Sequence, residues 1–108
     1  MDEFVTVPGD DAEENSVVRF AHTYDGYRLH RGLESLADLT QRVHEIWQRT
    51  GELGDDVDVL RGCLFYEVRA HRHSGGYGRF SEQPFTIALV RRIRTLSGGS
   101  VPLRSTIA

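Results

Sequence analysis

The sequence contains no lysine, because all 13 residues counted as lysine or arginine are arginines. Asparagine is almost absent as well, and Asn15 is the only one. Both amino acids are encoded by A-rich codons, so their joint depletion indicates a GC-rich genome and predicts a bacterial or phage source. Without lysine the chain also offers no side-chain amine for acetylation.

Cysteine and long apolar runs are equally scarce. Cys63 is the only cysteine, which excludes an internal disulfide framework and a cysteine-rich zinc site and agrees with a reducing compartment. No apolar run approaches the roughly 18 residues that a membrane span needs. The first residues are acidic where a signal peptide would be basic, so we expect a cytoplasmic protein with no membrane partner.

The charge is unevenly distributed over the 108 residues, whose net charge is -3. Residues 1–15 carry six acids and no arginine, whereas the rest of the chain has 13 arginines against 10 acids. We interpret residues 1–15 as a disordered acidic tail. Such a tail can also compete for the basic surface of the domain that follows it.

The first helix is expected to begin at Asn15 or Ser16, either of which can cap it. Its apolar face follows spacings of three and four, and comprises Val17, Phe20, Ala21, Tyr24 and Tyr27. An alternative exists, since the apolar residues also alternate and an Asp-Gly pair lies between two such runs. That alternative is an α+β fold with a hairpin at 17–31.

Three further helices have clearer patterns. Residues 33–50 form one apolar stripe that ends at Trp47, and Gly51 supplies a left-handed stop. Residues 56–73 have acids at the start, bases at the end and apolar residues on several faces, which predicts a buried helix. A glycine-rich loop then leads through Ser81, the expected N-cap, to a fourth helix that ends near residue 97.

Together these elements predict an all-α fold, a compact four-helix bundle-like domain over 16–97 in which the helix at 56–73 is central. Residues 98–108 are expected to be either flexible or docked in an extended form. No motif is specific enough to indicate a family.

One set of metal-ligand types lies along the third helix. Cys63, Glu67 and His71 are spaced by four residues and so lie along one line of that helix. Three such residues span about 12 Å and cannot all reach one ion, although two neighbours can. Metal or small-ligand binding by these residues is therefore only the third hypothesis. We expect no cofactor, and the sequence indicates no catalytic residue.

A second set is basic. Six arginines lie in sequence around the third and fourth helices: Arg69, Arg72, Arg79, Arg91, Arg92 and Arg94. Arginines with nearby aromatics suit phosphate contact and base stacking, so a nucleic-acid-associated regulator is the second hypothesis. The excess of only three positive charges argues against it.

Because catalytic patterns are lacking, the first hypothesis is a small non-enzymatic interaction domain with a protein partner. Its candidate interaction residues are the aromatics Tyr66, Tyr77 and Phe80. Leu64, Phe65 and Tyr66 project in three directions, and a small domain covers two of them more easily than all three. A homodimer that buries Tyr66 is therefore a further prediction.

Overall fold

The computed structural model describes residues 4–11, 14–24, 33–73 and 83–102, and these ranges contain four helices and one short sheet. In chain order the elements are β1 (Phe4–Thr6), α1 (Glu14–Ala21), α2 (Leu33–Thr50), α3 (Val57–His73), α4 (Pro84–Ser97) and β2 (Ser100–Pro102). β1 and β2 pair antiparallel, with Val5 opposite Val101. The fold is mostly helical and has four helices in the described ranges, as predicted, and the small sheet is an addition to that prediction.

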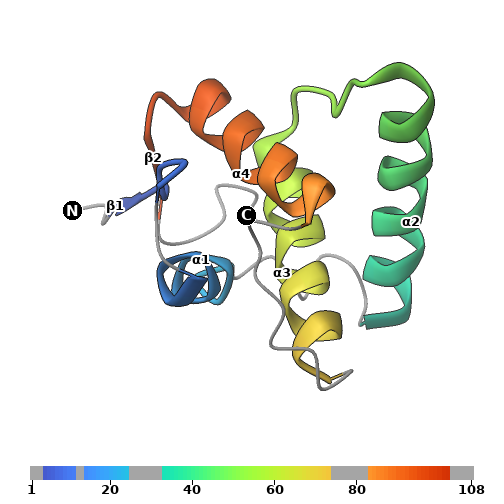
Figure 1. Cartoon of the computed structure of the whole chain (residues 1–108), viewed down its shortest axis with the longest axis horizontal. Helices are drawn as coiled ribbons and strands as arrows, with labels where there is room; N and C mark the ends of the chain where they lie inside the picture. Colours follow the sequence, from blue (N-terminus) through green and yellow to red (C-terminus); the bar gives the residue numbers. More distant parts are fainter. Residues whose placement is uncertain (1–3, 12–13, 25–32, 74–82, 103–108) are drawn as a thin grey trace.

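Helix α3 lies between the other helices, as Figure 1 shows, with α2 on one side and α1 on the other. Helix α4 packs across α3 and also contacts β2. The α3 residues Leu60, Cys63, Leu64 and Val68 are fully buried. Each Å² of apolar surface removed from water contributes about 25 cal/mol, so these four side chains stabilise the fold together with the core residues of α1 and α4.

Helix α2 has the predicted bounds, Leu33–Thr50, and Gly51 follows it with φ of 74°. Leu36 and Thr40 are buried against α3, and the Thr40 hydroxyl is satisfied by the Leu36 carbonyl at 2.7 Å. Trp47, at the end of the apolar stripe, is half-buried and packs against the core. Its ring packs on Phe85 of α4, with 5.3 Å between centroids.

Gly62 explains how closely the elements approach α3. A Cβ atom at this position would lie 3.0 Å from the Tyr24 hydroxyl and 3.1 Å from a methyl group of Leu36. Both distances are shorter than ordinary van der Waals contacts. The absence of a side chain at Gly62 therefore lets α2 and the segment after α1 pack directly on the α3 backbone.

The first predicted helix exists but is shorter than expected. α1 ends at Ala21, where Thr23 and Tyr24 donate backbone hydrogen bonds to Phe20 and Ala21 in tight turns. Tyr24 is nevertheless buried, with 7% of its surface exposed. The alternative hairpin at 17–31 is wrong over 17–21, which are helical, and Tyr27 lies outside the described residues.

The predicted disorder of residues 1–15 is wrong for residues 4–11. β1 pairs with β2, the Val7 amide donates to the Gly99 carbonyl at 2.9 Å, and Val7 is 4% exposed. The acidic composition did not indicate this because the pairing partner lies at the opposite end of the chain. Ser100–Pro102 is accordingly docked in an extended form.

Helix α4 begins later than Ser81, which lies outside the described residues. Gln83 occupies the N-cap position without a side-chain capping bond, and Pro84 is the first helical residue. Proline suits this position because its missing amide hydrogen would have no helical partner there. Its residues Phe85, Leu89 and Ile93 are buried in the core.

Candidate functional site

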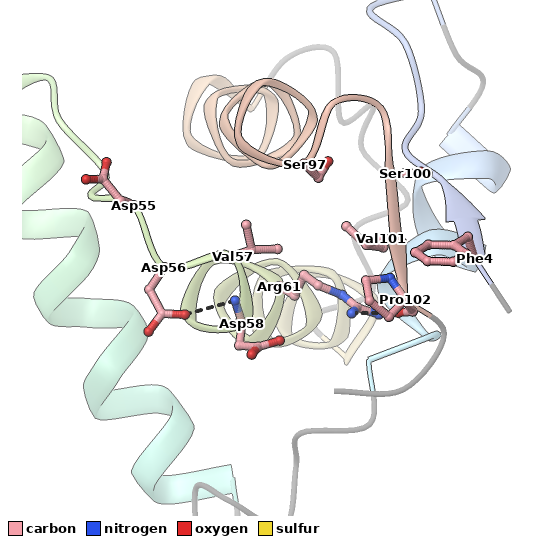
Figure 2. Close-up of a pocket in the computed structure, with 10 residues that line it drawn as sticks. All are labelled: Phe4, Asp55, Asp56, Val57, Asp58, Arg61, Ser97, Ser100, Val101 and Pro102. Atoms are coloured by element: carbon pink, nitrogen blue, oxygen red, sulfur yellow. Dashed lines mark hydrogen bonds between the residues drawn. The ribbon is translucent and has the colours of Figure 1, made fainter. Parts of the chain in front are cut away.

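An open groove of about 810 Å³ lies between the first turn of α3, the end of α4 and the two strands. Figure 2 shows the acids Asp55, Asp56 and Asp58 at one end of this groove and Phe4 at the other, with Arg61 and Val101 between them. We call it the α3–β2 groove. The short turn from Ser97 to Ser100 closes the side formed by α4.

Asp56 holds the first turn of α3 in place. One of its carboxylate oxygens accepts hydrogen bonds from the backbone amides of Asp58, at 3.0 Å, and of Val59, at 3.3 Å. This is N-capping, which satisfies amides that have no partner within the helix. Capping therefore fixes the position of Asp58 at the groove.

Asp55 is held by α4. The Arg92 guanidinium donates to its carboxylate at 2.5 Å and to the Gly54 carbonyl at 2.9 Å. No described residue forms an ion pair with the Asp58 carboxylate, so this is the acid at the groove that is open to a ligand.

Arg61 forms the floor of the groove and is 3% exposed. Its guanidinium donates to the carbonyl of Pro102 at 3.0 Å and to the carbonyl and hydroxyl of Thr23 at 3.4 and 3.3 Å. Burial lowers the pKa of Arg61, and the nearby negative charge of Asp58 opposes this shift. An arginine stays charged at neutral pH all the same, so Arg61 ties α3 to β2 as a buried cation.

Phe4 supplies an apolar surface at the other end of the groove. It is opposite Pro102 in the strand register, and 64% of its surface is exposed. Beside the groove, this exposed ring provides apolar surface that a ligand can cover. The α3–β2 groove therefore offers an aromatic ring and a carboxylate that forms no ion pair with a described residue, and both suit a ligand that is cationic and apolar.

Of the predicted interaction residues only Tyr66 is described, and it is not among the residues that line this groove. Tyr66 is half-buried on α3, and Tyr77 and Phe80 lie outside the described residues. The residues that the sequence analysis missed are Phe4 and Asp58. Phe4 was assigned to a disordered tail, and Asp58 was interpreted only as an acid that suits a helix N-terminus.

Of the proposed metal ligands, Cys63 and Glu67 lie one turn apart on α3. Cys63 is fully buried, and burial raises the pKa of its thiol to about 11, which disfavours the thiolate that binds metals. Glu67 is half-buried one turn further on, and the side chain of His71 is not among those described. No group of three His, Cys, Asp or Glu side chains suited to a metal occurs in the described ranges.

The arginine cluster is divided among several partners. Arg91 and Arg94 contact Asp10 of the N-terminal segment, whereas Arg92 contacts Asp55. Arg69 is exposed on α3. The side chain of Arg72 and the whole of Arg79 lie outside the described part of the chain.

Comparison of the sequence with protein-family models, curated proteins and solved structures gives no match. The function must therefore be argued from the geometry of this chain. Among the described helices, none has the length and apolar character needed to cross a membrane.

Proposed function

We propose that the protein is a non-enzymatic interaction domain that binds a basic peptide segment of a partner protein in the α3–β2 groove. The observation that carries the proposal is the exposed ring of Phe4 across the groove from the Asp58 carboxylate. An arginine or lysine side chain can pair with Asp58 while a neighbouring apolar side chain packs on Phe4.

The composition of the groove supports a binding role rather than a catalytic one. Its titratable side chains are three aspartates and Arg61, and Asp55, Asp56 and Arg61 are already engaged in structural contacts. A catalytic pair needs a nucleophile or base and a group that orients it within hydrogen-bond reach. A binding groove needs only complementary charge and apolar surface.

Selection of peptides from a displayed random library on the intact protein tests the proposal. We expect the selected peptides to carry arginine or lysine beside an apolar residue. In fluorescence anisotropy with one such peptide, Asp58→Asn should weaken binding by about tenfold, the loss expected for one charge-assisted hydrogen bond. Raising the salt concentration should weaken wild-type binding as well.

The matched control is Asp38→Asn, because Asp38 is an exposed acid on α2 and lies away from the groove. This variant should bind like wild type. Selected peptides without basic residues, or equal affinities for Asp58→Asn and Asp38→Asn, would contradict the proposal. Phe4→Ala should also weaken binding, since the apolar half of the site is then lost.

The remaining expectations stay predictions. A homodimer through Tyr66, a cytoplasmic location and a bacterial source have no observation beyond the sequence patterns that suggested them. The nucleic-acid alternative is less favoured than the peptide proposal because Arg92 is held by Asp55, so the arginines of α4 do not form a continuous basic surface.

A further inference from the structure

One carboxylate of the N-terminal segment lies between two arginines of α4. A single oxygen of Asp10 accepts hydrogen bonds from Nε of Arg91, at 3.0 Å, and from Nη2 of Arg94, at 2.7 Å. Nη1 of Arg94 donates at 2.9 Å to the carbonyl of Pro8. The two arginines are three residues apart on α4, so their guanidinium groups reach the same side of the helix.

This arrangement has the features of an anion site. Two guanidinium groups converge on one acceptor oxygen, and arginine presents paired donors that match carboxylate and phosphate oxygens. The Pro8 contact orients Arg94, which is the less exposed of the pair, at 30% against 59% for Arg91. The Asp10 side chain is 55% exposed, so an anion from solvent can reach the same donors.

We propose that Arg91 and Arg94 form a binding site for a phosphate monoester group, and that Asp10 occupies this site as an internal ligand in the free protein. A phosphate monoester carries up to two negative charges and three acceptor oxygens, whereas Asp10 carries one charge and presents one oxygen to both arginines. It can therefore replace Asp10 and satisfy more of the available donors.

The third arginine of α4 limits the size of the ligand. Arg92 is turned to Asp55 and Gly54, so it does not extend the pair into a longer basic surface. Two converging guanidinium groups suit one phosphate group better than a run of nucleic-acid backbone, which requires several cations in a row. The site is separate from the α3–β2 groove and does not depend on the function proposed for that groove.

Exchange of Asp10 for phosphate leaves the rest of the segment attached. The β1–β2 pairing and the bond from the Val7 amide to the Gly99 carbonyl do not involve Asp10. The internal carboxylate thus acts as a tethered competitor that lowers the apparent affinity for external anions.

Titration of the intact protein with inorganic phosphate and with phenyl phosphate tests the site, with the heat of binding in isothermal titration calorimetry as the readout for every variant. We expect Asp10→Asn to bind both probes roughly tenfold more tightly than wild type, because the tethered competitor is removed. The control is Asp11→Asn, which removes an exposed acid of the same segment and should bind like wild type. A preference for phenyl phosphate over inorganic phosphate would identify an organic phosphate as the source of the group.

The double variant Arg91→Gln/Arg94→Gln should lose binding of both probes, with its fold checked by circular dichroism. Unchanged binding by the double variant, or equal affinities of Asp10→Asn and Asp11→Asn, would overturn the proposal. So would a preference of Asp10→Asn for duplex DNA with a steep salt dependence, since that outcome indicates an extended basic surface instead.

Discussion

The middle of α3 and the N-terminal segment Phe4–Asp10 are held to the molecule by different forces. In α3 the side chains of Leu60, Cys63, Leu64 and Val68 are fully buried among the other helices. In the N-terminal segment only Val7 and Pro8 are buried, and Phe4 is mostly exposed. Besides the buried Val7 side chain, backbone pairing with β2 and the contacts of Asp10 and Pro8 with α4 attach this segment.

This contrast shows two ways of ordering a chain. Apolar burial is strong and can be recognised in the sequence, because the buried residues of a helix recur every three or four positions. The pairing of two short strands that are far apart in the sequence has no such local pattern. The N-terminal segment also carries the aromatic ring of the groove and the acid of the anion site, so its weaker attachment coincides with both proposed binding functions.

The largest effect is expected in the α3 core. Leu64→Ala should lower the free energy of unfolding by about 2 to 5 kcal/mol, because Leu64 is fully buried and the cavity cannot collapse completely. Urea denaturation followed by circular dichroism measures the change. Ile46→Ala on α2, where the side chain is 45% exposed, should cost much less, and a similar cost at the two positions would mean that α3 is not the core of the fold.

Arg61 ties α3 to β2, the strand with which the N-terminal segment pairs, and should show the next largest effect. Arg61→Met removes the donors to Pro102 and Thr23 while keeping an unbranched side chain, and the orphaned carbonyls should cost about 1 to 3 kcal/mol. The same denaturation measurement applies, with Arg69→Met as the control because Arg69 is exposed on the same helix. Equal stability of both variants would mean that apolar contacts alone dock β2.

The parts of the fold that were predictable from sequence are those where burial and local signals agree. Leu33–Thr50 was assigned correctly because an apolar stripe ends at a glycine that adopts a positive φ. α3 was assigned to within one residue for the same kind of reason. α1 was predicted too long, because turn bonds after Phe20 end the helix while Tyr24 remains buried and so continues the apolar pattern.

The candidate site was almost wholly beyond sequence reasoning. The α3–β2 groove is assembled from the two ends of the chain and the first turn of α3, and no local pattern brings these together. The acidic tail was nevertheless expected to compete for basic surface, and Asp10 does contact Arg91 and Arg94. The opposite charges indicated that acids near the N-terminus would contact arginines. The position of Asp10 beside Arg91 and Arg94, however, depends on the β1–β2 pairing, which the sequence did not indicate.

A matched pair of substitutions in the N-terminal segment separates attachment from binding. Val7→Ala should cost about 1 to 2 kcal/mol, since two buried methyl groups are lost. Phe4→Ala should leave the free energy of unfolding nearly unchanged, because its ring is 64% exposed, and yet weaken binding of a basic peptide. Both are measured by urea denaturation, and a large loss of stability in Phe4→Ala would mean that its ring is part of the core.

The smallest effect on stability is expected for Asp10→Asn, and its pH dependence identifies its origin. Hydrogen bonds from Arg94 and then Arg91 hold the pKa of the Asp10 carboxyl below its ordinary value of 3.8. A carboxyl whose pKa is lower in the folded state stabilises the fold above its ordinary pKa, and this contribution is lost as the pH falls through the folded-state value. The stability difference between wild type and Asp10→Asn should therefore be present at neutral pH and shrink below the ordinary pKa. It should also shrink at high salt, because the side chains of Asp10, Arg91 and Arg94 are partly exposed.

Urea midpoints of both proteins, from neutral pH to below the ordinary pKa of the carboxyl, measure this stability difference, with Asp11→Asn as the control. A difference that stays constant as the carboxyl is protonated would mean that Asp10 attaches the segment through its shape and not through its charge.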